Sequence, residues 1–448
     1  MKNNIGIFIA GSIVMLMSSC LGGGDATDVT GIKDAQISSL VLSHDSIADL
    51  ASVKFTIDQV NGLIFNNDSL PYGTQPGKVV CTLTYVMGVA AIGVAQEAIG
   101  DSTIWWNGTD SLDFSKPVKF IPTAYDGVTT KIYKAWINIH QVIPGLMVWE
   151  RLASPLTGIN ADGQKVVRHT RDNKEVFLMY SNTGGANRLH YSTTTDPKTW
   201  SELSLSGLPL TTDITQITSF ENILYAPAGG GVYRSEDGAS WVKVEETPVV
   251  SAILGVLKEG RNTTPTLAAI IESESSRHFA GMNKDGQWTK GDATPGNFPV
   301  SGFGSLGYNR VDNEYIAVVA GKDKDGGLLN VTWATGNALS WALLSGEEDN
   351  FFEKKAGVML AFYDDKFFLM GGINAEGEAS KDIHVSTNNG VTWSQADSLK
   401  IFPEAYTARG YASVEIDEAK YMLIFGGKTS NVAKTLDELW RGRINLLN

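Results

Sequence analysis

The stretches "SEDGASW" (Ser235–Trp241) and "STNNGVTW" (Ser386–Trp393) follow one pattern although they lie far apart in the chain. Each begins with serine, passes through an acid or amide to glycine, and ends with serine or threonine followed by tryptophan. Glycine permits a positive φ, and an acid or amide side chain can accept hydrogen bonds from its own turn. The pattern therefore predicts a tight turn that leads into a strand, and its repetition predicts a repeated structural unit.

Tryptophan recurs about every 40 to 50 residues through the second part of the chain. A short β-rich run begins at each of these tryptophans, a polar turn precedes most of them, and two further β-rich runs precede the turn. The residues are Trp149, Trp200, Trp241, Trp288, Trp341 and Trp393. Four strands in a period of this length are typical of one blade of a β-propeller.

The ends of this region predict how the propeller closes. Residues 409–448 supply three strands, so Trp440 falls on a third strand. The missing fourth strand is "LMVWERL" at Leu146–Leu152, ahead of the first complete blade. We therefore predict six blades over residues 146–448, closed by pairing of residues 146–152 with the last blade, which leaves no free sheet edge.

Residues 30–145 have a different pattern. Short β-rich runs include "SVKFTIDQ" (Ser52–Gln59), "KVVCTLTYV" (Lys78–Val86) and "KIYKAWINIH" (Lys131–His140), and turn residues separate them. Several short strands over about a hundred residues favour a β-sandwich. Residues 86–100, rich in alanine and glycine, fit either a helix or a loosely packed strand pair.

The N-terminus is typical of a secreted protein. Lys2 precedes an apolar run from Ile5 to Met17, which is too short for a membrane-spanning helix and has the proportions of a secretion signal. The small residues before Cys20 resemble a bacterial lipobox, although Met17 is not the residue usually found three positions before the cysteine. This resemblance implies that Cys20 becomes an acylated N-terminus; the alternative is an ordinary signal peptide that contains Cys20.

We accordingly expect residues 1–20 to be a lipoprotein signal peptide and residues 21–29 a flexible tether. The expected location is the outer membrane, facing the periplasm or the cell surface, with membrane contact through the lipid anchor only. The other cysteine, Cys81, lies in an alternating run and is expected to be a buried small side chain. If Cys20 is acylated, no intramolecular disulfide can form.

The composition argues against several kinds of partner. With 36 lysines and arginines against 49 acids, the net charge is −13, which disfavours nucleic acid or an anionic lipid surface as the main partner. The six histidines lack metal-ligand spacing. The acids of "GKDKDGG" (Gly321–Gly327) lack the distal glutamate of a calcium loop. We expect no metal and no cofactor.

Three motifs resemble known families. "STNNGVTW" resembles the Asp-box of sialidases and other propellers, with Asn388 in place of the acid, and "IFGG" (Ile424–Gly427) resembles the Gly-Gly of kelch blades. Residues 116–139 resemble the last hairpin of immunoglobulin-like spacers in lipoproteins of glycan-harvesting Gram-negative anaerobes. The combination resembles a family of secreted bacterial lipoproteins without assigned activity. It implies an all-β chain, with an immunoglobulin-like β-sandwich over residues 30–145 and a sialidase-like six-bladed propeller after it.

Sialidase activity is disfavoured by the arginines. Sialidases hold the substrate carboxylate with three arginines, because a planar guanidinium can bond both carboxylate oxygens. The first of them lies in an Arg-Ile-Pro segment, for which the nearest candidate here is the wrongly spaced "RLASP" at Arg151–Pro155. Arg168 and Arg409 are candidates on inner strands, and the third arginine has no clear position. No catalytic residue is predicted.

The sequence favours a monomeric, non-enzymatic lipoprotein whose propeller face binds a glycan or an envelope protein. We expect the binding face at the loops that lead into each blade and at those between second and third strands. The alternative is a glycoside hydrolase or lyase, which requires two carboxylates near Arg168 and Arg409 at the channel mouth. For Phe351 and Phe352, packing beneath the loop that carries them is an equal alternative to ligand binding. The candidate ligand-binding residues are Arg168, Arg188, Phe351, Phe352, Lys355, Tyr406 and Arg409.

Overall fold

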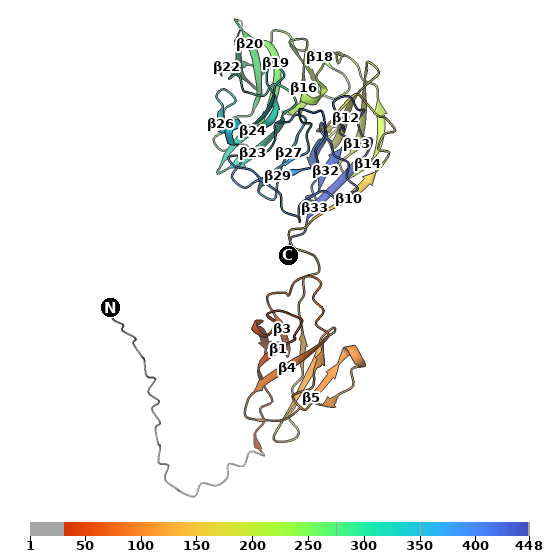
Figure 1. The fold of residues 1–448 in the computed structure, drawn as a ribbon, viewed down its shortest axis with the longest axis vertical. Coiled ribbons are helices and arrows are strands. Elements are labelled where there is room, and N and C mark those ends of the chain that lie inside the picture. Colours follow the sequence, from red (N-terminus) through yellow and green to blue (C-terminus); the bar gives the residue numbers. More distant parts are fainter. Residues whose placement is uncertain (1–30, 275, 350, 447–448) are drawn as a thin grey trace, which may run out of the picture. The chain divides into compact units, whose positions relative to one another are not determined.

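The computed structural model describes residues 31–274, 276–349 and 351–446, so the expected signal peptide, tether and lipidation site at Cys20 lie outside the described residues. The chain divides into two units, Met1–Ile143 and Pro144–Asn448. Strands build both units, and only short 3-10 helices interrupt them in the described part of the chain (Figure 1). The predicted all-β chain, with an N-terminal β-domain followed by a propeller, is confirmed.

The N-terminal unit contains two sheets, in which all strand pairs except β3 with β9 are antiparallel. The larger sheet has the order β2 (Phe55–Asp58), β3 (Leu63–Asn66), β9 (Tyr133–Trp136), β8 (Val118–Ala124), β5 (Val89–Gln96), β6 (Ile104–Trp105). The smaller sheet has the order β1 (Ile37–Ser43), β4 (Lys78–Tyr85), β7 (Leu112–Asp113). The 3-10 helices are η2 (Leu50–Ser52) and η3 (Glu97–Ile99). Residues 86–100, left open by the sequence, thus form a strand and a single helical turn.

The core of this unit follows from alternation along its strands. On β8, Val118, Phe120, Pro122 and Ala124 are buried, and the residues that alternate with them are only partly buried. Cys81 on β4 is 2% exposed, and burial raises the pKa of its thiol to about 12. A thiol with so high a pKa is unreactive at neutral pH, which agrees with the expectation of a small buried side chain.

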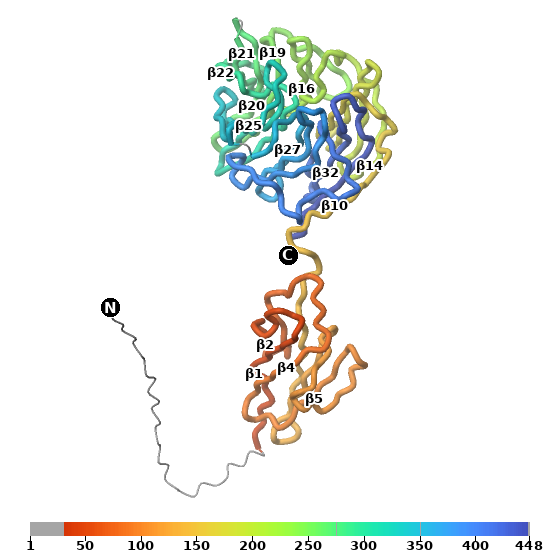
Figure 2. Tube along the Cα trace, in the orientation of Figure 1, coloured from red at the N-terminus to blue at the C-terminus, as the bar shows by residue number. Residues whose placement is uncertain are grey.

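The second unit consists of six four-stranded antiparallel sheets, the blades of the propeller (Figure 2). Blade 1 contains β11 (Gly163–Arg171), β12 (Lys174–Thr183), β13 (Ala186–Thr193) and β14 (Asp196–Leu203). Blade 2 contains β15 (Thr218–Phe220), β16 (Ile223–Ala228), β17 (Gly231–Ser235) and β18 (Val242–Lys243). Blade 3 contains β19 (Val249–Leu257), β20 (Thr266–Ser273), β21 (Ser276–Asn283) and β22 (Trp288–Ala293).

The remaining blades repeat this order, except that the last borrows its fourth strand. Blade 4 contains β23 (Gly304–Arg310), β24 (Asn313–Lys322), β25 (Leu328–Thr335) and β26 (Ala342–Ser345). Blade 5 contains β27 (Met359–Tyr363), β28 (Lys366–Met370), β29 (Ile383–Ser386) and β30 (Ser394–Gln395). Blade 6 contains β31 (Ser413–Ile416), β32 (Met422–Phe425), β33 (Leu439–Ile444) and β10 (Met147–Ala153). Between blades lie the 3-10 helices η4 (Ile214–Gln216) and η5 (Glu347–Asp349).

Strand β10 closes the ring by pairing antiparallel with β33. Trp149 on β10 stands opposite Gly442, where a Cβ would lie 2.4 Å from the Trp149 ring. The Trp149 ring also packs on Phe402, with the ring centroids 4.6 Å apart. The closing strand therefore contributes a half-buried aromatic ring as well as a row of backbone hydrogen bonds.

The repeated turns make the local hydrogen bonds that their residues predict. Asp237 Oδ1 accepts from the backbone N–H groups of Ala239 and Ser240, at 2.8 and 2.7 Å. Asn388, which replaces the acid, accepts from the N–H of Thr392 at 2.9 Å. The tryptophans that follow, Trp241 and Trp393, are both 4% exposed.

Apolar clusters fill every junction between neighbouring blades. Phe177 of blade 1 meets Phe425 of blade 6, with ring centroids 5.3 Å apart, so the series of clusters runs around the complete ring. The other five junctions are filled in the same way. Each blade thus buries one face on each of its two neighbours, and the space left at the ring's centre is bordered mainly by the first strands.

Candidate functional site

A cavity of about 820 Å³ lies at the centre of the propeller. The first strands of all six blades line it: β11, β15, β19, β23, β27 and β31. This volume falls in the range of ligand pockets, which runs from roughly 300 to 1,000 Å³. The convergence of six strands means that a ligand here would touch residues from the whole length of the propeller.

The cavity opens at the end where the first strands finish. Its exposed lining residues Glu175, Asn222, Lys258 and Gly307 lie near the C-terminal ends of first strands or on the hairpins that follow. Since strands alternate in direction, the turns between third and fourth strands share this end. A neighbouring hollow of about 410 Å³ confirms this, because it is lined both by first hairpins and by the repeated turn at Asp237.

The opposite end of the channel is narrow. The backbone N–H of Gly357 donates to Gly302, and that of Tyr411 donates to Gly357, both at 2.6 Å, which ties together the segments leading into blades 4, 5 and 6. The space there is about 60 Å³ and no exposed residue lines it; Phe303 and Lys165 line both this space and the main cavity. The expectation that the loops leading into the blades form the binding face is therefore wrong for the channel, which opens at the other end.

Charged side chains of both signs surround the cavity. Arg168 on β11 lies 3.5 Å from Glu175 on β12, measured from Nη1 to Oε2, and its Nη2 donates to the Ile416 carbonyl at 3.1 Å. The Arg168 Nε is buried and has no partner within the described residues. Lys165 makes no ion pair within 4 Å in this part of the chain. The Lys165 ammonium is thus available to a ligand, whereas the Arg168 Nε is enclosed by protein.

The channel environment shifts two pKa values in opposite directions. Burial lowers the pKa of Lys165, although Glu415 and Asp213 act against this shift. Burial raises the pKa of Glu415, although Lys165 and Arg168 oppose the rise. Both groups are therefore less charged than they would be in water, and an entering polar ligand can stabilise their charged forms.

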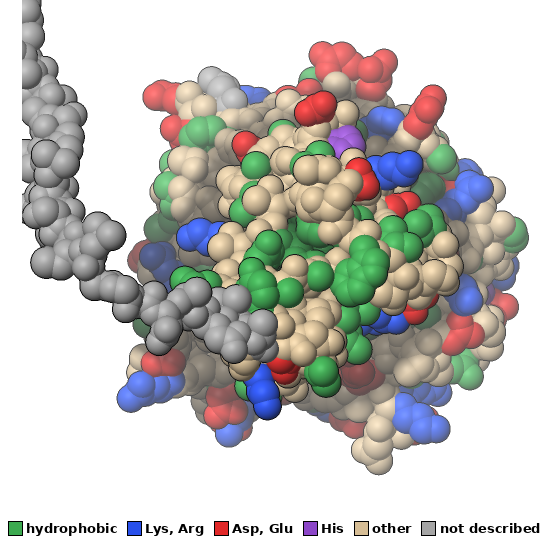
Figure 3. Space-filling model, turned by 90° about the horizontal axis from the view of Figure 1, so that it is seen from below, with side chains coloured by type: hydrophobic (Ala, Val, Ile, Leu, Met, Phe, Trp, Pro, Cys, Tyr) green, Lys and Arg blue, Asp and Glu red, His purple; other side chains and the backbone are tan. Residues whose placement is uncertain are grey.

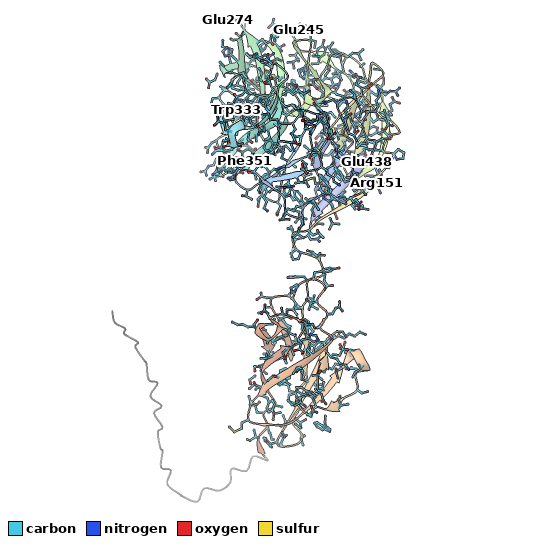
Figure 4. The ribbon with its side chains drawn as sticks, in the orientation of Figure 1. Arg151, Glu245, Glu274, Trp333, Phe351 and Glu438 are labelled. Carbon is cyan, nitrogen blue, oxygen red and sulfur yellow. The ribbon has the colours of Figure 1, made fainter. Side chains whose placement is uncertain are left out.

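Arg409, predicted to bind ligand, lies instead inside blade 6. Its side chain is fully buried, its Nη2 forms an ion pair with Glu438, and its Nη1 donates to the Gly426 carbonyl at 2.8 Å. The buried Tyr406 ring lies 4.1 Å from the guanidinium. Arg151 of the closing strand also approaches Glu438, at 3.7 Å (Figure 4). The expectation that Arg409 and Tyr406 face a ligand is wrong, because all of these contacts enclose them in the blade.

Phe352 and Lys355 are also buried. The Phe352 ring packs on Trp393 and His384, with centroid distances of 5.8 and 6.0 Å, and Phe351 packs against the same cluster (Figure 4). Lys355 is fully buried, and burial lowers its pKa. The alternative of packing beneath the loop is thus the observed one. These side chains fill the junction of blades 4 and 5 and do not form a surface.

Arg188 and Arg168 differ in position. Arg188 lies on β13, a third strand, where its exposed side chain pairs with Glu202 of the neighbouring fourth strand at 3.2 Å. It does not line the central cavity, whereas Arg168 does. The structure therefore brings only Arg168, of the seven predicted residues, to the cavity wall.

Sequence reasoning missed Lys165, Glu175, Lys258 and Glu415. A signal was present, since "KVVRH" and "SVEI" place charges within short first strands that are otherwise apolar. Among the described residues, no group of three or more histidines, cysteines or acids could hold a metal ion. No helix in that same part of the chain could span a membrane.

Comparison with known proteins gives two family matches. Residues 28–137 match the domain of unknown function DUF6242, N-terminal domain, and residues 144–448 match the DUF6242 beta propeller domain. No curated protein matches the chain. A solved structure titled "Structure of YjhT" is 15% identical, with 63% of this chain and 95% of that chain covered and a TM-score of 0.45.

Proposed function

The chain belongs to the DUF6242 family, and we propose that it is a cell-envelope lipoprotein whose propeller binds a carbohydrate without altering it. The observation that carries the proposal is the open cavity at the end of the first strands. It joins polar side chains from several blades, among them Gln216, Ser219 and Ser305, to charged donors and acceptors. Sugar hydroxyl groups both donate and accept hydrogen bonds, so a wall of mixed polarity suits them.

An acidic sugar is the form of ligand that fits best. Lys165, Arg168 and Lys258 supply cationic donors around the cavity, whereas the carboxylates there are Glu175, already beside Arg168, and Glu415. Burial lowers the pKa of Lys165 and raises that of Glu415, so these two groups lose charge together, which leaves Arg168 and Lys258 against Glu175. Cations then outnumber anions in the channel of a chain whose net charge is −13.

A hydrolase or lyase remains the second candidate, and one observation favours it. Two carboxylates, Glu175 and Glu415, line the cavity with Arg168, as such an enzyme requires. A carboxyl group with a raised pKa suits a general acid. Arg409, however, plays no part in this arrangement, and no three-arginine clamp exists among the residues lining the cavity.

The test is a glycan-array screen of the soluble chain, with neutral and uronate-containing oligosaccharides. We expect binding to an acidic glycan, and Lys165→Met should weaken it by on the order of tenfold or more, because one charge-assisted hydrogen bond is lost. Arg188→Met, which removes an exposed cation outside the cavity, is the matched control. Equal loss in both variants would contradict the channel site. Release of new reducing ends or of an unsaturated uronate would favour the enzyme instead.

The envelope location is proposed from the N-terminal sequence. "SSC" (Ser18–Cys20) after the apolar run supports an acylated mature chain that begins at Cys20 and is anchored in the outer membrane. The proposed chain is a monomer. An envelope protein is the other partner class that such a location allows. Mass spectrometry of the mature chain should find an acylated N-terminal Cys20, and an unacylated N-terminus elsewhere would exclude the anchor.

A further inference from the structure

One end of the N-terminal unit displays apolar side chains to solvent. Val60, Met87 and Val128 are 91%, 88% and 82% exposed, on the connections β2–β3, β4–β5 and β8–β9. Ile132, Tyr85 and Tyr125 add further exposed apolar area beside them. Figure 3 views the molecule from this side and shows hydrophobic side chains gathered among polar ones. We call these six residues the tether-end surface.

Hydrogen bonds between the connections hold this surface together. The Tyr125 N–H donates to the Gly88 carbonyl at 2.9 Å, which joins the β8–β9 and β4–β5 connections. Lys131 Nζ donates to the Gln59 carbonyl at 2.5 Å, which joins β8–β9 to β2–β3. The three connections therefore form one continuous end of the unit.

Two turns of this surface share the pattern Asp-X-Val. Asp58 Oδ1 accepts from the N–H groups of Val60 and Asn61, at 2.9 and 3.0 Å. Asp126 Oδ1 likewise accepts from Val128 and Thr129, at 3.0 and 2.8 Å. In each turn the carboxylate is occupied by backbone N–H groups while the valine projects into solvent. Backbone N–H groups thus satisfy one oxygen of each carboxylate, and a highly exposed valine side chain stands beside it.

The chain enters the unit at this same end. Residues 32–36 lie against the β4–β5 connection, since the Val86 N–H donates to the Gln36 carbonyl at 3.0 Å and a Cβ on Gly88 would lie 2.7 Å from Ile32 Cγ2. Strand β9 runs away from this end, and the chain continues from it toward the propeller. The tether predicted from the sequence, residues 21–29, joins this end of the unit to Cys20.

We propose that the tether-end surface seats on the lipid bilayer, where its valines and Met87 enter the boundary between headgroups and acyl chains. The proposal rests on the lipid anchor proposed above, because acylated Cys20 would hold this end of the unit against the membrane, and it adds a second membrane contact to the anchor, which is the only one expected from the sequence alone. Apolar side chains gain free energy on leaving water in proportion to their area, and tyrosines favour the membrane interface. Attraction to anionic lipid is not required.

The experiment places a fluorescent reporter on this surface in the full acylated chain. Val128→Cys and Met87→Cys are labelled with an environment-sensitive thiol dye and reconstituted in phosphatidylcholine vesicles. Val432→Cys is the matched control, since Val432 is 94% exposed and lies on the propeller. Buried Cys81 should not react. We expect blue-shifted, stronger emission at 87 and 128 and no change at 432; emission at 87 and 128 equal to that at 432 would overturn the proposal.

The proposed lipid anchor and the proposed membrane contact of the tether-end surface are tested separately. The intact mass of the mature chain decides acylation. If Cys20 carries no lipid, the labelled chains are mixed with excess vesicles, and a response at 87 and 128 still supports the surface, whereas no response overturns it. In unacylated chain the triple change Val60→Ser, Met87→Ser, Val128→Ser should lower vesicle partitioning by on the order of tenfold. Unchanged partitioning would also overturn the proposal, and Val432→Ser is the control.

Discussion

Arg409 stabilises the last blade through its buried ion pair with Glu438. Breaking a buried ion pair leaves an unpaired charge, which costs roughly 3–5 kcal/mol. We therefore expect Arg409→Met to lower the free energy of unfolding by about that amount in urea denaturation. Arg188→Met removes an exposed pair and should change stability by less than about 1 kcal/mol. Similar losses in the two variants would show that Arg409 is not a structural charge.

His384 should make the propeller sensitive to mild acid. Burial, with Lys355 nearby, lowers the pKa of His384 from 6.5 to about 4. Between these values the unfolded chain binds more protons, so the free energy of unfolding should fall as the pH drops from 6.5 toward 4. The pKa shift sets an upper bound of about 3 kcal/mol on this loss of unfolding free energy, and the partial exposure of His384 makes the actual loss smaller. Urea unfolding at several pH values should show a weaker pH dependence in His384→Gln; parallel curves would contradict this.

Single residues also show where sequence reasoning reaches its limit. The buried position of Cys81 follows from alternation along its own strand, so local pattern was sufficient. The position of Arg409 depends on Glu438 and Tyr406, whose side chains meet it only after the blade has formed. In the sequence alone, an arginine close to a tyrosine in a loop suggests a ligand-binding pair on the surface. Only the position of Glu438, which pairs with the arginine, shows that the pair is buried.

At the scale of elements, the closing strand is the feature that the spacing of the sequence repeats predicts most directly. The repeated turns and tryptophans indicate that the last blade lacks a fourth strand of its own, and β10 occupies that position beside β33. Which end of the channel is open could not be predicted from the spacing of the repeats. Strand order is the same whichever end is narrow, and the narrowing depends on contacts of Gly302, Gly357 and Phe303 across different blades.

Loss of the closing strand should prevent cooperative folding of the propeller. A chain that begins at residue 154 lacks β10, which exposes the edge of β33 and removes the Trp149 ring, at a cost of roughly 3–5 kcal/mol for the ring alone. We expect it to aggregate or to melt without a sharp transition in circular dichroism. A chain from Pro144 to Asn448 is the control. Equal melting of both chains would refute the role of β10.

At the scale of the whole molecule, the two units have separate cores. The apolar cluster of the N-terminal unit contains residues from Ile37 to Ile139, and every other cluster in the described chain belongs to the propeller. No described cluster draws residues from both units. Each unit can therefore be stable without the other.

The propeller should therefore unfold as one cooperative body, independently of the N-terminal unit. Each blade shares a cluster with both neighbours, and Phe177 with Phe425 completes the ring, so no blade can open without exposing two clusters. We expect calorimetry of the full chain to resolve two transitions, and the chain from Pro144 to Asn448 to keep the propeller transition within about 2–4 °C, the shift produced by roughly 1 kcal/mol in a domain of this size. A larger shift would mean that the units stabilise each other, and several propeller transitions would mean that blades open singly.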